Sequence, residues 1–463
     1  MRYISTRGQA PVLGFSDVLL AGLATDGGLY VPESWPHFSN KELIEFGRLD
    51  YSELAFRVIK PFIDGEIADD NLEAIINATY ARFDHPAVAP LKQLSFNTWL
   101  LELFHGPTLA FKDFAMQLLA GLFEHELNRR GERVTIIGAT SGDTGAAAVE
   151  ALRHNESAVV FMLHPHERVS EIQRRQMTTV DAPNIHNIAI QGTFDDCQSL
   201  VKTLFSDQKM REELNFSAVN SINWARVAAQ CIYYFYSALA LGAPHRPVSF
   251  SVPTGNFGNI FAGYAAKRMG LPIDRLIIAS NRNDILTRFC HDGHMRANEV
   301  TPTYSPSMDI QVSSNFERLL FELYERSAKD VVSLMQQFKD RGKFQITQTR
   351  FEQFREDFDA HRFDDKETVQ WIKEIHQQTG ELLDPHSVIG VAAAHQTPEA
   401  MSSPIVSLAT AHPGKFPQVM QAAIGAAAPL PQRMESLLNS KEKYQVLSNS
   451  IDDLKEFIWT ASQ

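Results

Sequence analysis

The chain has 463 residues, of which 44% are hydrophobic and 21% are charged, and its formal net charge is −12. This composition is that of an ordinary globular protein, long enough to bury a large core without disulfide or metal staples. The acidic balance argues against a nucleic-acid partner, which selects clustered positive charge, but a local patch can still bind a small anion.

Cysteine spacing and hydropathy predict the compartment. Cys197, Cys231 and Cys290 are far apart in sequence and form no CxxC pattern, so we expect a reducing environment. The apolar stretch near the N-terminus is short and interrupted by Asp17, which argues against a signal peptide. No apolar run approaches the roughly 18 residues of a membrane span. We expect a cytoplasmic protein that binds neither membrane nor nucleic acid.

The rhythm of the sequence changes along the chain. Residues 1–95 mix turn signals with short helical patterns and are predicted to form an N-terminal cap. Short β-branched runs then alternate with helical patterns, which is typical of an α/β fold with parallel sheets. We expect a smaller α/β lobe over 96–240 and a larger one over 241–463 that ends in a helical tail. The predicted strands are 134–137, 158–163, 248–252, 276–279 and 406–409.

Two predicted strands end in a glycine-rich turn that opens a helix, GATSGDTG at 138–145 and PTGNFGN at 253–259. Ligands of open α/β sheets bind at the carboxyl ends of the strands, where helix N-termini offer unpaired N–H groups to an anion. Two such turns suggest two anionic groups in one crevice; alternatively, the glycines only make tight turns. Neither turn matches GxGxxG or a P-loop, which disfavours dinucleotide and P-loop nucleotide binding.

Lys112 lies in the segment HGPTLAFKDFAMQ at 105–117, among apolar neighbours. Desolvation in such surroundings favours the uncharged amine, which can form a Schiff base with an aldehyde or act as a base. The alternative is a surface lysine on an amphipathic helix, paired with Asp113. The cluster CHDGH at 290–294 groups possible metal ligands, but no second ligand pair stands at a zinc-site spacing, so no metal is predicted.

The segments GPTLAFKDFA, ATSGDTG and PTGNFGN together resemble threonine synthases of the bacterial and fungal type. That family belongs to the fold-type II enzymes that depend on pyridoxal 5′-phosphate (PLP), which resemble the β subunit of tryptophan synthase. The resemblance runs along nearly the whole chain, in the segments STRGQAPVLGFSDVLLAGLATDGGLYVPESWP, NSINWAR, SMDIQVSSNFERLL, DPHSVIGVAAA and ATAHPGKFP. It implies two open parallel-sheet lobes and an N-terminal cap. The family pattern has glycine at the position of Glu167, which leaves the shape of that turn open.

The resemblance also implies roles for individual residues. Lys112 would carry PLP, Thr410 would hydrogen-bond the pyridine nitrogen, and Asp143 would face the 3′ oxygen in a protonation state left open. The PLP phosphate would be held by Gly255, Asn256, Phe257, Gly258 and Asn259. The substrate would be O-phospho-L-homoserine, bound by Thr140, Ser141, Gly142, Thr144, Asn220, Ser221 and Arg226. Without the resemblance, Arg226 would be interpreted as a surface charge on a helix.

The implied reaction is a γ-elimination followed by β-replacement, which converts O-phospho-L-homoserine and water to L-threonine and phosphate. This is the last step of threonine biosynthesis. Lys112 would move protons at Cα, Cβ and Cγ while PLP stores the electrons. Other possibilities stay open: a serine/threonine dehydratase or a phospho-homoserine lyase of the same fold, or a non-catalytic anion-binding homologue. The sequence does not distinguish a monomer from a homodimer.

Overall fold

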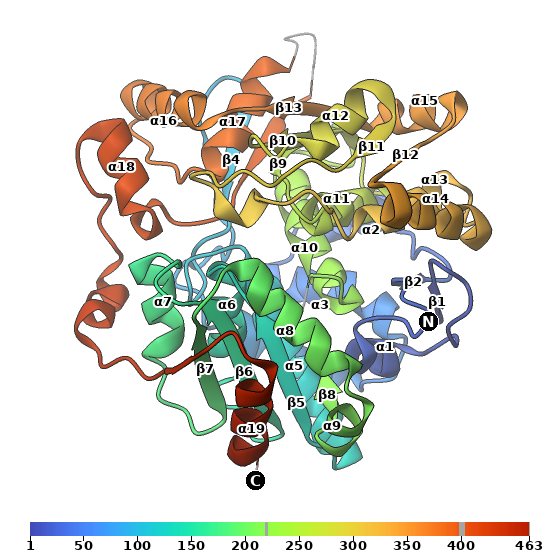
Figure 1. Ribbon diagram of the computed structural model, residues 1–463. Helices are drawn as coiled ribbons and strands as arrows, with labels where there is room; N and C mark the ends of the chain where they lie inside the picture. The colour runs from blue at the N-terminus through green and yellow to red at the C-terminus, as the bar shows by residue number, and fades with distance from the viewer. Residues whose placement is uncertain (218–220, 398–402, 463) are drawn as a thin grey trace.

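The computed structural model describes residues 1–217, 221–397 and 403–462 of the chain. Two lobes, each built on its own sheet, face one another, and the N-terminal residues pack beside them (Figure 1). No helix within these ranges is long and apolar enough to cross a membrane.

The larger lobe is built on a six-stranded sheet in the order β13-β10-β9-β14-β4-β3. Its strands are β3 (Leu91–Gln93), β4 (Thr98–Glu102), β9 (Val248–Pro253), β10 (Ile273–Ser280), β13 (Phe358–Arg362) and β14 (Ile405–Ala409). All pairs are parallel except β3 with β4. Since β14 lies between β4 and β9, the residues that follow these three strands meet at one edge of the sheet. β9 and β14 are buried along their whole length, as expected for parallel strands covered on both faces.

The smaller lobe is built on a five-stranded parallel sheet in the order β15-β7-β6-β5-β8. Its strands are β5 (Val134–Ala139), β6 (Ala158–Pro165), β7 (Ile185–Ile190), β8 (Phe216–Ser217) and β15 (Gln445–Leu447). Its helices are α5 (Lys112–Arg130), α6 (Asp143–Leu152), α7 (Glu171–Thr178), α8 (Phe194–Ser206), α9 (Gln208–Glu213) and α19 (Ile451–Ala461). Leu454 and Ile458 of α19 pack with Leu200 and Leu204 of α8, so the C-terminal tail returns to this lobe.

The remaining elements form the cap and the helical layers of the larger lobe. The cap holds β1 (Tyr3–Ser5), α1 (Phe15–Ala21), β2 (Tyr30–Pro32), α2 (Asn40–Phe46), α3 (Tyr51–Ile63) and α4 (Asp69–Tyr80). The others are α10 (Trp224–Ala240), α11 (Gly258–Arg268), α12 (Ile285–Asp292), β11 (His294–Arg296), η1 (Pro306–Met308), α13 (Phe316–Leu323), α14 (Ala328–Arg341), β12 (Lys343–Gln345), α15 (Gln348–Asp357), α16 (Asp365–Thr379), α17 (Ser387–Gln396), η2 (Pro413–Lys415), α18 (Pro417–Ile424) and η3 (Gln432–Asn439).

Helix α10 joins the three parts of the molecule. It packs against α3 of the cap, α5 of the smaller lobe and α11 of the larger lobe. Nearly all of its side chains are buried, and they contribute Trp224, Tyr233, Tyr234 and Phe235 to the main core. Its packing therefore fixes the positions of α5 and α11 relative to α10. The predicted site residues Lys112, Arg226 and Gly258 lie in the first turns of α5, α10 and α11.

The predicted strands are confirmed as β5, β6, β9, β10 and β14. The expected ranges 1–95, 96–240 and 241–463 divide the chain in sequence order, whereas the main sheet of each lobe takes strands from more than one range. β3 and β4 join the larger lobe, and β15 joins the smaller one. Glu167 adopts a φ of 57°, in the left-handed region that favours glycine, which explains why a glycine suits this turn.

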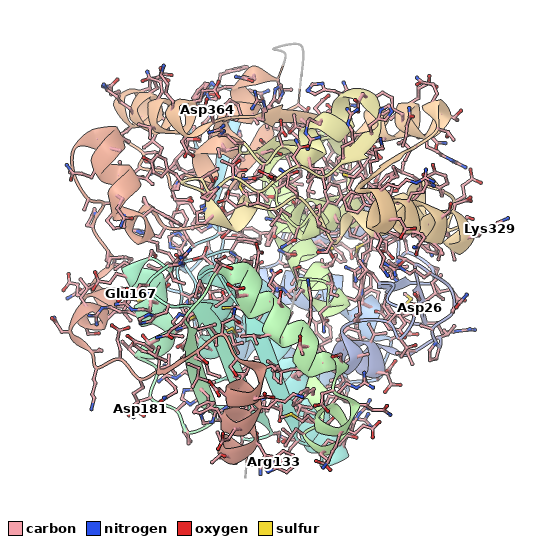
Figure 2. All side chains as sticks on the ribbon, viewed as in Figure 1. Asp26, Arg133, Glu167, Asp181, Lys329 and Asp364 are labelled. Atoms are coloured by element: carbon pink, nitrogen blue, oxygen red, sulfur yellow. The ribbon has the colours of Figure 1, made fainter. Side chains whose placement is uncertain are left out.

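Some charged side chains lie on the surface of the molecule, and a few are buried in its interior. Figure 2 shows Arg133, Asp181 and Lys329 on the outside of the molecule. Lys112, Arg226 and Lys415, by contrast, are buried. Burial of a charged group is costly unless a partner compensates for it, so these three residues mark the region where ligand chemistry is expected.

Candidate active site

Lys112 is the first residue of α5, and the segment before it is held against the carboxyl end of β14. The backbone N–H of Phe111 donates to the Thr410 carbonyl at 2.8 Å, and Ala110 forms a bridge with Ala411. These backbone bonds place Lys112 where β4, β9 and β14 end. This is the position that ligand sites take in open α/β sheets.

The Lys112 amine is buried and lies between the two lobes. Its Nζ atom is 3.3 Å from Oδ2 of Asp143 and 3.3 Å from Oγ of Ser307. Burial lowers the pKa of Lys112; Asp143 opposes this shift, and the positive charges of Lys415 and Arg226 add to it. The alternative of a surface lysine paired with Asp113 is wrong, because Lys112 is only 7% exposed.

Asp143 begins α6 and lies at the centre of a buried charge cluster. Its Oδ1 atom accepts hydrogen bonds from Gln173 Nε2 at 2.8 Å and lies 2.6 Å from Lys415 Nζ. Burial alone would raise the pKa of Asp143, but the ion pairs with Lys415 and Lys112 outweigh burial and hold the pKa well below its usual range. In the ligand-free chain, the contacts with Lys415 and Lys112 therefore favour the ionised form of Asp143.

Sequence reasoning missed Lys415, which is fully buried in η2. Its Nζ atom contacts Asp143 and donates to the Thr108 carbonyl at 2.9 Å. The only local signal was its place in the segment ATAHPGKFP, between two prolines. That pattern predicts a turn but not the direction of the lysine side chain.

The turn before α6 holds most of the predicted substrate residues. Gly142 has a φ of 144°, and a Cβ there would lie 2.6 Å from the side chain of Gln173, so only glycine fits. The Thr140 hydroxyl accepts from the backbone N–H groups of Gly142 at 3.0 Å and Gly145 at 2.9 Å, which assigns it to stabilising the turn. Ser141 and Thr144 are half-buried at the helix start.

The turn between β9 and α11 has the features of an anion site. Phe257 adopts a φ of 63°, α11 begins at Gly258, and no side chain among the described residues caps this helix start. A Cβ on Gly255 would lie 3.0 Å from the carbonyl of Ser307, so glycine allows close backbone approach there. Because the first N–H groups of a helix attract negative charge, this turn fits a phosphate.

Asn259 lies in the first turn of α11 and is oriented by two tyrosines. Its Oδ1 atom accepts from the hydroxyls of Tyr233 at 2.6 Å and Tyr234 at 3.1 Å. Its buried Nδ2 atom has no hydrogen-bond partner within the parts of the chain that the structure describes. A bound anion would satisfy this amide, which is a second reason why the turn fits the PLP phosphate.

Arg226 is a buried cation that can bind an anion. It lies in the first turn of α10 and is 5% exposed. Within residues 1–217, 221–397 and 403–462 it has no ion-pair partner, and its Nη1 atom has no hydrogen bond. Burial lowers the pKa of Arg226 to about 10. The interpretation as a surface charge is therefore wrong, and an uncompensated buried guanidinium calls for an anionic ligand.

Two further predicted residues lie before α10. The Ser221 carbonyl accepts from the Asn315 side-chain amide at 3.1 Å. Asn220 lies outside the described residues.

Thr410 follows β14 and is buried. Its backbone N–H donates to Ser387 Oγ at 2.8 Å, and the Ser387 hydroxyl donates in turn to Asp384. Asp384 also contacts His386 Nδ1 at 2.8 Å. His386 Nε2 accepts from the Ser307 backbone N–H at 3.3 Å, so one buried carboxylate orients both Thr410 and the partner of Lys112.

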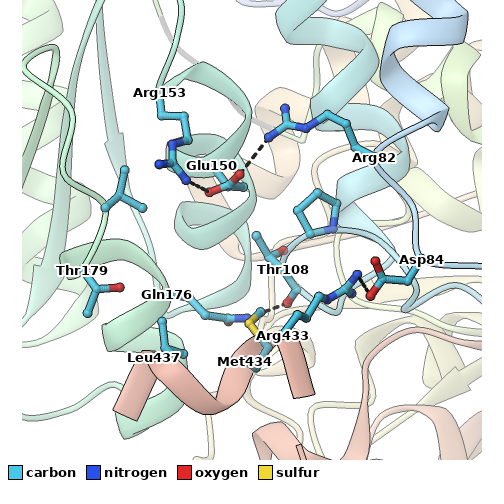
Figure 3. Close-up of a pocket in the computed structure, with 12 residues that line it drawn as sticks. Arg82, Asp84, Thr108, Glu150, Arg153, Gln176, Thr179, Arg433, Met434 and Leu437 are labelled. Carbon is cyan, nitrogen blue, oxygen red and sulfur yellow. Dashed lines mark hydrogen bonds and ion pairs between the residues drawn. The ribbon is translucent and has the colours of Figure 1, made fainter. Parts of the chain in front are cut away.

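A cavity of about 360 Å³ adjoins this site through Thr108, whose carbonyl also accepts from Gln176 Nε2 at 2.8 Å (Figure 3). The charged residues of its lining are ion-paired with one another: Arg82 and Arg153 with Glu150, and Arg433 with Asp84. None of the predicted site residues lines the cavity. All the charged side chains that line this cavity are therefore paired, unlike Arg226 within the described part of the chain.

The residues present fit PLP in three respects. A buried lysine with a lowered pKa can bond an aldehyde. The uncapped start of α11 can hold a phosphate. The buried Thr410 lies beside them at the end of β14. Arg226 provides for a second anion.

Comparisons with known proteins agree with this geometry. Family models match residues 2–80 (threonine synthase N terminus), 85–338 (pyridoxal-phosphate dependent enzyme) and 387–458 (threonine synthase, C-terminal). The threonine synthase of Pseudomonas aeruginosa is 55% identical over 99% of this chain and 98% of its own length.

Solved structures agree over the full length. PLP-bound threonine synthase from Brucella melitensis has a TM-score of 0.98 and 51% identity, and covers 100% of both chains. Threonine synthase from yeast has a TM-score of 0.95 and 38% identity, over 99% of this chain and 98% of its own. These relatives confirm the fold-type II α/β architecture, the PLP dependence and the threonine synthase activity expected from the sequence. The chain belongs to the threonine synthase family.

Proposed function

We propose that the site around Lys112, Asp143 and Arg226 carries out the threonine synthase reaction on O-phospho-L-homoserine. Two observations together carry this proposal: Arg226 is buried without an ion-pair partner among the described residues, and a separate helix start at Gly258 has no side-chain cap. Two anion sites match a phosphorylated cofactor and a phosphorylated substrate. An enzyme that dehydrates free serine or threonine needs only the first of them.

All the predicted site residues except Thr140 and Asp143 are assigned a contact with cofactor or substrate in this proposal. When bound, PLP supplies an electron sink for carbanion chemistry. Gly255 to Asn259 would hold its phosphate, and the Thr410 hydroxyl would hydrogen-bond its ring nitrogen. The Lys112 amine holds the cofactor and then accepts and returns protons at Cα, Cβ and Cγ of the substrate. Its lowered pKa supports this, because an amine acts as a base only when it is uncharged.

The substrate phosphate is assigned to Arg226, Ser221 and Asn220. A guanidinium that is already desolvated gains a charge-assisted hydrogen bond when phosphate binds. The same bond stabilises the charge that develops as phosphate leaves. Ser141, Gly142 and Thr144 at the start of α6 are assigned to the substrate carboxylate, which suits a helix N-terminus.

The test is product analysis with the purified chain, PLP and O-phospho-L-homoserine. We expect equal amounts of inorganic phosphate and L-threonine. Phosphate with ammonia and an oxo acid would identify the phospho-homoserine lyase instead. Ammonia from free serine or threonine, without use of the phosphorylated substrate, would identify a dehydratase. Absence of any product, with no PLP absorbance, would support the non-catalytic homologue.

We also propose a cytoplasmic location. Cys197, Cys231 and Cys290 are buried free thiols, which supports a reducing compartment. The prediction of a monomer or a homodimer is checked by multi-angle light scattering of the purified chain.

A further inference from the structure

The buried charges around Lys112 are unequal in number. One carboxylate, Asp143, lies between two lysine amines, Lys112 and Lys415. The contact with Lys415 is 2.6 Å long and the contact with Lys112 is 3.3 Å. The two oxygens of the carboxylate are divided between the lysines, Oδ1 toward Lys415 and Oδ2 toward Lys112. The shorter contact indicates that Asp143 is paired primarily with Lys415.

The backbone around Lys415 holds its side chain in this position. Pro413 begins η2, and the backbone N–H of Gly414 donates to His412 Nδ1 at 3.1 Å. The Nζ atom has a second partner in the Thr108 carbonyl at 2.9 Å, and the side chain is fully buried. A buried ammonium is stable only with such partners, so Lys415 and Asp143 depend on each other.

We propose that Lys415 is a positioning residue: as the closer ion-pair partner of Asp143, it weakens the pairing of that carboxylate with Lys112 and so favours the uncharged Lys112 amine. The inference deepens the proposed function, on which it rests, because it explains how a lysine beside a carboxylate can remain a nucleophile and a base. Lys415 itself transfers no proton and forms no covalent bond in this proposal.

Several charged groups act on Lys112 and Lys415. Asp143 favours the charged form of Lys112, whereas Lys415 and Arg226 disfavour it. Lys415 in turn interacts with the buried Asp113 and with His412. Removal of the Lys415 charge therefore acts on Lys112 twice. It removes a repulsion, and it leaves Asp143 with Lys112 as its only lysine partner among the residues that the structure describes.

The test measures the charge state of Lys112 in the full chain freed of PLP, without reference to turnover. Trace labelling with acetic anhydride at about pH 6 to 11, followed by peptide mass spectrometry, gives the pH midpoint of each lysine. We expect Lys415→Met to raise the Lys112 midpoint by about one unit, which is about a tenfold loss of free amine at neutral pH. Lys415→Arg, which keeps the charge, should leave the midpoint near that of the wild type.

A matched control uses another lysine–aspartate pair. Lys443 contacts Asp181 at 2.5 Å, but both side chains are exposed. Lys443→Met should leave the Lys112 midpoint unchanged. An equal shift in this variant would mean that the effect is not specific to Lys415, and it would overturn the proposal.

The double variant Lys415→Met/Asp143→Asn separates electrostatics from folding. With both charges removed, the Lys112 midpoint should return to the wild-type value or below it, and this holds even if Lys415→Met alone folds poorly. A midpoint unchanged in folded Lys415→Met, or one that stays raised in the double variant, overturns the inference. A wild-type chain with a low Lys112 midpoint that releases no phosphate from O-phospho-L-homoserine would instead contradict only the proposed function.

Discussion

Asn315 donates both its backbone N–H, at 3.1 Å, and its side-chain amide, at 2.9 Å, to the carbonyl of Asn256. The same amide donates to the Ser221 carbonyl at 3.1 Å, and the fully buried Arg318 donates to Asn315 Oδ1. Asn315 therefore joins the turn proposed for the PLP phosphate to the segment proposed for the substrate phosphate. It touches neither ligand in this scheme, yet it sets the distance between their sites.

Replacement of Asn315 should therefore weaken cofactor binding. Asn315→Ala leaves the Ser221 carbonyl and one Arg318 N–H without their partner and removes one of the two donors to the Asn256 carbonyl. The expected cost is about 2 kcal/mol, or about 30-fold in PLP affinity. The measurement is a PLP titration of the ligand-free chain followed by absorbance. Asn298→Ala, at an exposed asparagine, is the control. Equal PLP affinity in both variants would show that Asn315 does not position the turn.

Lys112→Ala should abolish turnover and leave the fold intact. The side chain is removed from a buried site where its charge is disfavoured, so no loss of stability is expected. Phosphate release should fall by about a thousandfold or more, because both the covalent anchor and the base are lost. Borohydride should no longer attach PLP to the peptide 105–117, as mass spectrometry can check. Lys329→Ala, at an exposed lysine, should retain activity; retained activity in Lys112→Ala would refute the assignment.

Arg226 is predicted to lower the stability of the ligand-free chain and to strengthen substrate binding. Arg226→Met should raise the KM for O-phospho-L-homoserine by about 10- to 100-fold through loss of a charge-assisted hydrogen bond. PLP content should stay unchanged. Burial lowers the pKa of this guanidinium to about 10. The desolvated charge therefore costs the ligand-free fold up to about 3 kcal/mol, and the variant should unfold at a higher temperature than the wild type.

The matched variant is Arg226→Lys, which keeps the charge but loses the planar fork. The melting temperature of Arg226→Lys should stay near that of the wild type. Its KM should lie between those of the wild type and Arg226→Met. Loss of PLP in either variant would place Arg226 at the cofactor phosphate instead. A lower melting temperature for Arg226→Met would show that the guanidinium has a partner in the ligand-free chain.

The candidate site residues that the sequence indicates without the family resemblance are those with local signals. Lys112 is flanked by apolar residues, and the turns at 138–145 and 253–259 combine glycines with a preceding strand. The residues that it missed act over long sequence separations. Ser307 lies 195 positions from Lys112 and Lys415 lies 307 positions from Thr108, so only the folded sheet order brings them together.

The strand orders of the two main sheets depart from sequence order for a related reason. The sequence of β4 is that of an ordinary short buried strand. In the structure β4 pairs with β14, a strand about 300 residues away, with Thr98 opposite Ile405 and Glu102 opposite Ala409. The partner of a strand depends on how the rest of the chain folds. The sequence of one strand therefore does not determine which strand lies beside it.

The stability of the folded chain is expected to depend on pH through Asp113. Asp113 is fully buried and accepts from the Thr108 backbone N–H at 2.8 Å and its hydroxyl at 2.7 Å. Burial raises the pKa of Asp113 to about 6, although these bonds and Lys415 oppose the shift. The folded chain thus holds this proton more tightly than the unfolded one. The stabilisation is complete below the unfolded pKa near 3.8 and is lost as pH rises through about 6.

Asp113→Asn should remove that dependence. Its side-chain oxygen can still accept from the Thr108 N–H, and its amide can donate to the Thr108 hydroxyl. The variant should therefore match the wild type near pH 4 and exceed its free energy of unfolding by up to about 3 kcal/mol above pH 6. Urea unfolding of both proteins across this range gives the difference, in which the contributions of all other groups cancel. A difference that does not change with pH would mean that Asp113 does not gain its proton on folding.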